Sequence, residues 1–403
     1  MDRYKSFFRG IAYAGYGIVF LFAVYTFEKS IPDQIYVKAG EAIDYQFQVP
    51  VTMEIQEDSS PVAKSTNNAN VRQSYIVTCR LFGIFPVKDI EVVLVDGDAV
   101  YAGGMPIGIY VKTRGVLVIG TSEVERPDGS EAAPAENILK AGDYILSVNG
   151  EKVAEKEDLQ RLVQQNGAEK EILKINRKGE EVEVGVTPVQ NKNGTYMLGA
   201  WVRDDLAGIG TLTYYKEDGT YGALGHAVSD GDVGERIQMR EGYVYNAQII
   251  GVKKGQKGNP GELSGMIRYQ SADCLGTIEE NTDIGIYGKL DGNIAALPRG
   301  DYYNICYKQD IKQGPATIIC GFTGEKKEYA IEIESLDYSG REANKGILFR
   351  VTDEQLLDMT GGIVQGMSGS PILQDGKIIG AVTHVFVSDS SMGYGIFIEN
   401  MVE

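Results

Sequence analysis

Glycine is the feature that most constrains the fold of this chain. Fifty of the 403 residues are glycine, well above the roughly 7% of an average protein. Glycine weakens helices and permits tight turns, and stretches with helical periodicity are few. Most apolar stretches alternate with polar residues at the period of a strand. We therefore predict a mainly β fold, in a chain long enough for two or three domains.

The charge balance argues against one class of partner. The chain carries 56 acidic and 39 basic residues, which gives a net charge of −17. Such an excess repels the phosphates of nucleic acids, and no basic stripe interrupts it. We therefore expect no nucleic-acid partner.

The four cysteines give no sign of a metal site. Zinc sites typically use closely spaced cysteine pairs, and no C-x-x-C pair occurs here. We therefore predict no metal. Both one or two disulfides and buried free thiols fit the wide spacing of Cys79, Cys274, Cys306 and Cys320.

The first 30 residues have the pattern of a cytoplasmic tail followed by a membrane anchor. Residues 11–27 are uncharged and mostly apolar, and Arg3, Lys5 and Arg9 precede them. Seventeen helical residues span about 26 Å, slightly less than a hydrocarbon core of about 30 Å. The basic flank should stay in the cytoplasm, which places the rest of the chain across the membrane. A cleaved signal peptide is the alternative, but residues 28–32 offer no small-x-small cleavage site.

Residues 31–102 are predicted to be an extended and β region. Within it, residues 57–70 are polar and rich in turn-forming residues, which is typical of a linker or a mobile loop. Residues 74–95 alternate apolar and polar side chains and are rich in valine and isoleucine, which predicts two or three strands.

Residues 103–189 resemble a PDZ domain, an α+β module. The resemblance rests on the motif A-G-D-Y-I-L-S-V-N-G at residues 141–150. A helix is predicted at residues 156–165, where Leu159, Leu162 and Val163 share one face. A closing hairpin is predicted around Lys178 and Gly179.

The PDZ resemblance implies a peptide-binding edge. PDZ modules capture a peptide end with a loop and add the peptide to a strand. The residues that match this loop are Pro106, Ile107, Gly108 and Ile109. The alternatives are that a segment of this chain fills the groove, or that the module is merely structural.

The stretch G-G-I-V-Q-G-M-S-G-S-P-I-L at residues 361–373 resembles the nucleophile turn of trypsin-like proteases. Glycines allow the sharp turn that pushes a hydroxyl into a cleft while N–H groups converge on an oxyanion. By position in the motif, Ser368 is the nucleophile, and the N–H groups of Gly366 and Ser368 form the oxyanion hole. Ser370 stands where that family usually has glycine. An ordinary β-turn is the alternative.

A serine nucleophile requires a base, normally histidine, and the chain has two. His226 lies in a glycine-rich stretch after a predicted strand, where an imidazole could face a cleft. His384 lies within an alternating strand, where a polar side chain is more often structural. We therefore predict His226 as the base and His384 as a pocket or packing residue. Base before nucleophile is the chain order of trypsin-like enzymes.

The acid that would orient the base is not decided by chemistry alone. The aspartates between or beside the other two residues are Asp230, Asp273, Asp283, Asp353 and Asp358.

The chain as a whole resembles the SpoIVB peptidase family. The resemblance rests on L-G-A-W-V-R-D at 198–204, G-I-G-T at 208–211, G-H at 225–226 and the turn at 361–371. It implies that Asp353 is the acid and that residues 190–403 form a trypsin-like double β-barrel. Met367 replaces the aspartate with which secreted digestive proteases bind a new N-terminus, so control by that ion pair is not available.

The family resemblance also implies a biological role. It implies a membrane-anchored serine endopeptidase, without a cofactor, that cleaves itself and acts in the space between the forespore membranes. Its substrate there would be a membrane-bound regulator of an intramembrane protease, so that pro-sigma-K is processed. The alternatives are an HtrA-like quality-control protease, in which PDZ modules follow the protease domain, and a non-catalytic PDZ scaffold.

Overall fold

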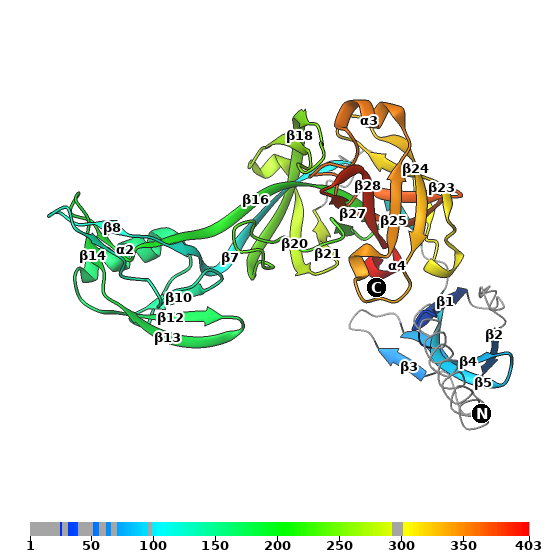
Figure 1. The fold of residues 1–403 in the computed structure, drawn as a ribbon, viewed down its shortest axis with the longest axis horizontal. Coiled ribbons are helices and arrows are strands. Elements are labelled where there is room, and N and C mark those ends of the chain that lie inside the picture. Colours follow the sequence, from blue (N-terminus) through cyan, green and yellow to red (C-terminus); the bar gives the residue numbers. More distant parts are fainter. Residues whose placement is uncertain are drawn as a thin grey trace, which may run out of the picture.

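The structure, a computed structural model, describes Tyr25 and residues 31–38, 51–55, 62–65, 71–95, 99–291 and 301–402. Within these residues it is mainly β, as predicted, with two six-stranded barrels and a smaller α+β module (Figure 1). Among the residues described, no helix is long and apolar enough to cross a membrane. The predicted anchor at residues 11–27 lies outside the described residues except for Tyr25.

The N-terminal region forms a five-stranded sheet. Its order is β1 (Gln34–Lys38), β5 (Phe85–Val95), β4 (Val71–Leu81) and β2 (Val51–Ile55), with β3 (Val62–Ser65) also on β4. β3 falls within the predicted polar linker and pairs with the first residues of β4. The sheet buries a small apolar cluster that includes Ile35, Val77 and Val92.

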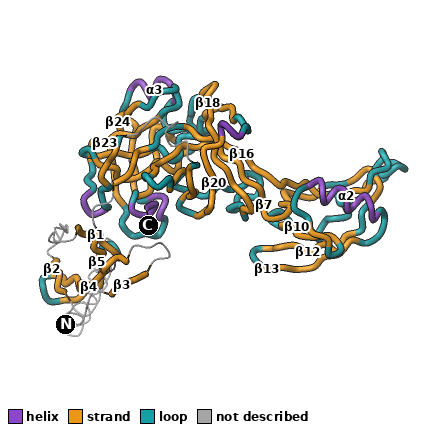
Figure 2. The backbone as a smooth tube through the Cα atoms, turned by 180° about the vertical axis from the view of Figure 1, so that it is seen from behind, coloured by secondary structure: helices purple, strands orange, loops and turns teal. Residues whose placement is uncertain are grey.

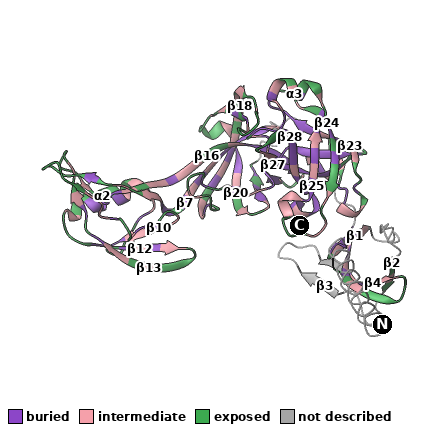
Figure 3. Cartoon of the chain, in the orientation of Figure 1, coloured by how far each residue is buried: buried purple, intermediate pink, exposed green. Residues whose placement is uncertain are grey.

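The first barrel is closed by pairing between its first and last strands. Its order is β7 (Pro106–Thr121), β18 (Met239–Lys253), β20 (Cys274–Thr282), β21 (Gly285–Leu290), β17 (Thr220–Ala223) and β16 (Ala200–Tyr215). The ring closes because β16 also pairs with β7. Its buried core includes Val244, Tyr221 and Ile286, and Figure 3 shows buried residues along the strands of both barrels.

The second barrel contains the end of the chain. Its order is β23 (Gly314–Cys320), β24 (Lys327–Leu336), β25 (Ile347–Val351), β28 (Asp389–Phe397), β27 (Lys377–Phe386) and β26 (Pro371–Gln374). Helix α3 (Glu354–Thr360) follows β25, and α4 (Glu399–Val402) follows β28. Ile318, Phe349 and Ile372 lie in the barrel's core.

The α+β module lies within the first barrel's sequence, between β7 and β16. It contains β10 (Tyr144–Val148), α2 (Lys156–Asn166), β12 (Glu171–Arg177) and β13 (Glu180–Val186). The helix predicted at 156–165 is confirmed, with Leu159, Leu162 and Val163 buried. The predicted hairpin around Lys178 is confirmed as the β12–β13 pair.

Buried charge explains the aspartate of the A-G-D motif in this module. Asp143 is 1% exposed. Its carboxylate accepts bonds from Arg177 Nε and Nη2 at 2.7 and 2.6 Å, and from the Lys140 N–H at 2.8 Å. Such a buried carboxylate needs a charged, hydrogen-bonded partner, and the arginine at the end of β12 supplies it.

Two long strands join the module to the first barrel. β7 and β16 have 16 residues each and pair from Thr121 with Ala200 to Pro106 with Thr211. Their outer ends belong to the module and their inner ends to the barrel, as seen from behind in Figure 2.

Short strands complete the fold: β6 (Ala99–Ala102), β8 (Val124–Glu125), β9 (Glu131–Ala132), β11 (Glu151–Lys152), β14 (Val189–Gln190), β15 (Tyr196–Met197), β19 (Glu262–Ile267) and β22 (Tyr302–Asn304).

Candidate active site

The predicted nucleophile turn lies between α3 and β26 of the second barrel. Gly366 and Gly369 have φ values of +96° and +97°, a region that side chains rarely tolerate. A Cβ on Gly369 would lie 2.1 Å from the carbonyl oxygen of Thr211. Glycine is therefore required at this position both by conformation and by the close approach of β16.

Ser368 is half-buried at this turn, and its Oγ donates to the carbonyl of Thr383 at 2.8 Å. The neighbouring N–H groups of Met367 and Gly369 donate to Val364 and Val382. In contrast, no described residue accepts a hydrogen bond from the N–H of Gly366 or Ser368. The turn therefore holds two backbone donors without an acceptor, which is what binding of an oxyanion requires.

His226 belongs to the first barrel, three residues after β17, and lies against β27 of the second. A Cβ on Gly225 would lie 2.8 Å from Cγ2 of Thr383, so the two segments are in close contact. The ring centroids of His226 and His384 are 5.3 Å apart. The His226 ring thus lies beside the His384 ring, and the segment of His226 contacts Thr383, whose carbonyl accepts the hydrogen bond of the Ser368 hydroxyl.

The hydrogen bond of His226 favours one tautomer. Its Nδ1 lies 2.8 Å from the carbonyl oxygen of Ala227, and a carbonyl can only accept. Nδ1 must therefore carry the proton, which leaves Nε2 with a lone pair. Burial lowers the pKa of His226, and the Ala227 carbonyl partly opposes this. A neutral imidazole with a free Nε2 is the form in which histidine acts as a base.

His384 is also held neutral by burial. Burial lowers its pKa to about 4, with smaller effects in the same direction from the charges of His226 and Lys345 and an opposing effect from Glu342. Its Nδ1 is buried and has no hydrogen-bond partner among the described residues. A register shift in the β27–β28 ladder lies between Val382 and His384, and such bulges redirect side chains.

Asp353 caps a helix in this structure. Its Oδ1 accepts from the N–H of Leu356 at 2.9 Å and its Oδ2 from the N–H of Ala330 at 3.3 Å. It therefore stands at the N-cap of α3, and both carboxylate oxygens accept from backbone N–H groups. The structure brings His226 and Ser368 to the same strand but does not join Asp353 to His226 by a hydrogen bond.

Two of the other candidate aspartates pair with arginines instead. Asp230 is 1% exposed, pairs with Arg203 and accepts the N–H groups of Asp232 and Val233. Asp283 lies 3.2 Å from Arg236 with its side chain 84% exposed. None of them accepts a hydrogen bond from His226 in the described part of the chain.

Ser370, which departs from the usual glycine, is buried behind the turn. Its Oγ lies 3.4 Å from the Sγ of Cys320 and accepts from this thiol. All four cysteines are free, so the free-thiol interpretation is confirmed. Among the described residues, no group of three or more His, Cys, Asp or Glu could hold a metal ion.

The predicted peptide-binding residues of the module lie in the first barrel instead. Residues 106–109 are buried in β7 and pair with β16 on one edge, and residues 107–109 pair with β18 on the other. No strand can add to an edge that is already paired. As placed here, Pro106, Ile107, Gly108 and Ile109 therefore offer no peptide-binding edge.

An open edge exists at the outer end of β16. Residues 200–205 pair with β7 on one side only, and no described strand occupies the other side. The N-terminus of α2 lies there, because the N–H of Lys156 donates to Asp204 at 3.0 Å. The N–H groups of Leu198 and Gly199, just before β16, have no acceptor among the described residues. In the sequence, the signal for this edge is the pair Leu198-Gly199 directly before β16.

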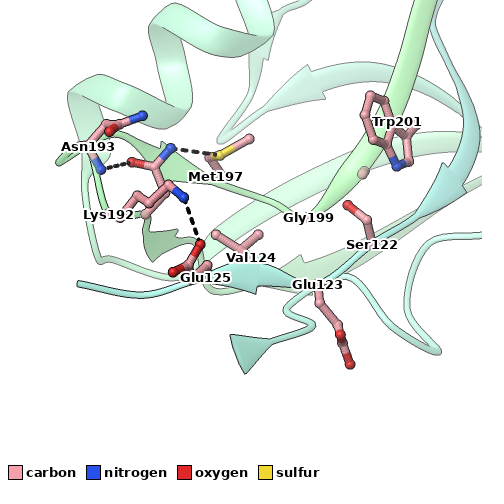
Figure 4. A pocket seen from close by; sticks show the side chains of 11 residues that line it. Ser122, Glu123, Val124, Glu125, Lys192, Asn193, Met197, Gly199 and Trp201 are labelled. Atoms are coloured by element: carbon pink, nitrogen blue, oxygen red, sulfur yellow. Dashed lines mark hydrogen bonds and ion pairs between the residues drawn. The ribbon is translucent and has the colours of Figure 1, made fainter. Parts of the chain in front are cut away.

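A pocket lies at the start of β16, next to the end of β7 and to β8, and Figure 4 shows its lining. Trp201, the only tryptophan, borders it with a side chain 64% exposed. Glu125 and Lys192 form an ion pair of 2.9 Å at the opposite wall. The pocket thus combines an exposed aromatic ring with polar groups at the start of β16.

Two family models match the chain. The model of a family described as SpoIVB peptidase S55 matches residues 194–402, and that of the PDZ domain matches residues 127–177. No curated protein matches the chain. Among solved structures, the chain is similar to an HtrA-type protease, a serine-to-alanine variant of AlgW with a decapeptide, at 11% identity and a TM-score of 0.28. The alignment covers 74% of this chain and 61% of that one, so the chain spans less than two thirds of its length.

Proposed function

This chain belongs to the SpoIVB peptidase S55 family, and from that premise we propose that it is a PDZ-containing serine endopeptidase with Ser368 as nucleophile and His226 as base. One observation carries the proposal. The Ser368 turn of one barrel and the His226 loop of the other meet at Thr383 and His384 of β27. Contact between two barrels at the nucleophile is the arrangement of trypsin-like enzymes.

The chemistry follows from the groups at this junction. Ser368 Oγ leaves the Thr383 carbonyl, gives its proton to Nε2 of His226 and attacks the peptide carbonyl. The unpaired N–H groups of Gly366 and Ser368 stabilise the oxyanion. His226 then protonates the leaving amine, and water releases the acyl group by the same steps in reverse. We assign the orienting acid to Asp353 from its position in the family motif.

The biological role is proposed from the family alone. We infer a protease anchored by residues 11–27, with its catalytic part in the forespore intermembrane space and possible release by self-cleavage. It would cut a membrane-bound regulator of an intramembrane protease and so activate pro-sigma-K processing. A quality-control protease of the HtrA type remains a weaker candidate, because its PDZ modules follow the protease domain.

Labelling with a fluorophosphonate probe tests the serine mechanism. The probe forms a covalent bond only with a serine that a neighbouring base has activated. We expect one label per chain, and peptide mass spectrometry should place it on Ser368. The His226→Ala variant should label far more slowly. Label spread over surface serines, at rates unaffected by the loss of His226, would contradict the proposal.

We also propose that peptides bind at the open edge of β16 rather than at residues 106–109. A peptide that adds a strand there would receive main-chain bonds from residues 200–205 and place its end near the free N–H groups of Leu198 and Gly199. Trp201 lies on this segment and is the chain's sole tryptophan, so it reports on the site alone.

Tryptophan emission measures this binding directly. Titration with a peptide that has a free C-terminal carboxylate should shift the Trp201 emission to shorter wavelength, because an added strand shields the ring from water. The same peptide with an amidated C-terminus should bind more weakly, since the carboxylate is what the free N–H groups hold. If the two peptides bind with equal affinity, or if the emission spectrum does not change, the proposal of a peptide site at this edge is wrong.

A further inference from the structure

Thr211 joins the first barrel to the nucleophile turn by two hydrogen bonds. It lies on β16 and is 3% exposed. Its Oγ1 donates to the carbonyl of Gly366 at 2.8 Å, and its N–H donates to the carbonyl of Ser368 at 2.9 Å. One side chain and its own backbone therefore hold the two residues whose N–H groups are proposed to bind the oxyanion.

These two hydrogen bonds fix the direction of the Ser368 N–H, because peptide units are planar. The unit that carries the Ser368 N–H joins Met367 to Ser368. The units on either side of it contain the carbonyls of Gly366 and Ser368, and both carbonyls are held by Thr211. Because each unit is a rigid plane, fixing its neighbours fixes the direction of the Ser368 N–H.

The other proposed donor is held from a different side. The Gly366 N–H shares a peptide unit with the carbonyl of Gln365, which accepts from the N–H of Leu263 at 2.8 Å. Gly366 itself has a φ of +96°, and glycine can change conformation at little steric cost. The hydrogen bond from the Thr211 hydroxyl to the Gly366 carbonyl thus restrains the backbone of this glycine, which connects the two proposed N–H donors.

We propose that Thr211 is a positioning residue that sets the oxyanion hole of this enzyme. The inference rests on the proposed serine mechanism and adds to it a residue from the other barrel. Thr211 lies on the same strand as the open edge at residues 200–205, so one continuous strand runs from the proposed peptide site to the proposed oxyanion hole.

Thr213 provides a matched control. It lies two residues further along β16, at a register shift with β17 between Leu212 and Tyr214, and it is also buried. Its Oγ1 has no hydrogen-bond partner among the described residues. Valine at position 213 therefore removes a hydroxyl from the same strand without removing a hydrogen bond.

The experiment compares Thr211→Val, Thr211→Ser and Thr213→Val in the full chain. The probe is a fluorophosphonate, whose phosphoryl oxygen occupies the oxyanion position, and the measurements are the maximal labelling rate at Ser368 and the half-saturating probe concentration. Loss of a whole oxyanion donor costs about 100- to 1000-fold, so a misdirected donor should lower the maximal rate about 10- to 100-fold. The half-saturating concentration should stay unchanged. Thr211→Ser should recover most of the rate, and Thr213→Val should match the wild type.

The outcomes separate this inference from the proposed function. If the wild type is labelled at Ser368 and Thr211→Val is labelled equally fast, Thr211 has no positioning role. An equal loss in Thr211→Val and Thr213→Val would also overturn it, because the effect would then be general loosening of the strand. If the wild type takes no label at Ser368, the proposed function itself fails. Should Thr211→Val not fold by circular dichroism, Thr211→Ala gives the same comparison.

Discussion

Replacing Ser368 by alanine is expected to lower kcat for peptide hydrolysis about a millionfold, while the protein stays folded. Removal of the nucleophile in a serine protease leaves only the catalysis that binding and the oxyanion hole supply. In the structure, the Ser368 hydroxyl makes one hydrogen bond, to the Thr383 carbonyl. Loss of one such bond costs only about 0.5–1.5 kcal/mol of folding free energy. Activity and stability should therefore separate cleanly.

Self-cleavage followed on a gel measures this effect without knowledge of the natural substrate. Purified wild type and Ser368→Ala are incubated at several concentrations, and fragments are identified by mass spectrometry. Ser370→Ala is the matched control, because Ser370 lies in the same turn but faces Cys320 in the interior. It should fragment as the wild type does. Equal fragmentation of wild type and Ser368→Ala would remove the serine mechanism and leave contaminating proteases as the cause.

Local patterns were sufficient to predict the elements whose signals are local. The spacing of Leu159, Leu162 and Val163 predicts the helix at 156–165. Apolar residues at helical spacing indicate one buried helix face, whichever element covers it. The glycines of the nucleophile turn were likewise informative. Gly366 and Gly369 have the positive φ that a sharp turn requires.

Features that depend on pairing between distant strands could not be read from the sequence. The PDZ resemblance predicts the peptide-binding loop at residues 106–109, by their position before the second strand of that pattern. Which edge is open, however, depends on the pairing of β7 with β16 and β18. Residues 106–109 are covered on both sides, whereas residues 200–205 of β16 are not. Composition does not say which strand edge stays open, because this depends on the pairing register of strands that are distant in the sequence.

The two hydrogen bonds between Thr211 and the nucleophile turn could not be predicted from the sequence either. The G-I-G-T motif at 208–211 was recognised only as part of a family pattern. Its threonine lies 155 residues before Gly366, with which it forms a hydrogen bond. Nothing in the local spacing indicates this contact, because it arises from the packing of one barrel on the other.

Asp353→Asn should separate the two roles that this residue can have. As an N-cap, Asp353 accepts the N–H of Leu356, and asparagine caps helices about as well as aspartate. Folding stability should therefore change little. As the orienting acid, Asp353 would stabilise the imidazolium that forms on His226, and the equivalent change in a serine protease triad lowers kcat about 10,000-fold. We expect a loss of about this size with an unchanged melting temperature.

The hydrogen bond of His226 to Ala227 limits what an orienting acid could add. The Ala227 carbonyl already selects the tautomer of His226, so a carboxylate is not needed for that purpose. A neutral carbonyl stabilises a cation less than a carboxylate does, and the buried ring therefore still lacks a counter-charge. For Asp353 to supply one, its carboxylate must leave the N–H groups of Leu356 and Ala330 and approach His226.

Self-cleavage rates and thermal unfolding of Asp353→Asn and Asp353→Ala decide between the roles. Both variants remove the charge, but only alanine removes the cap, which typically costs about 0.5–2 kcal/mol. An acid role predicts that both are inactive and that only Asp353→Ala is less stable. If Asp353→Asn cleaves itself at the wild-type rate, Asp353 is a helix cap alone. Among the described residues, the Ala227 carbonyl would then be the group that orients the base.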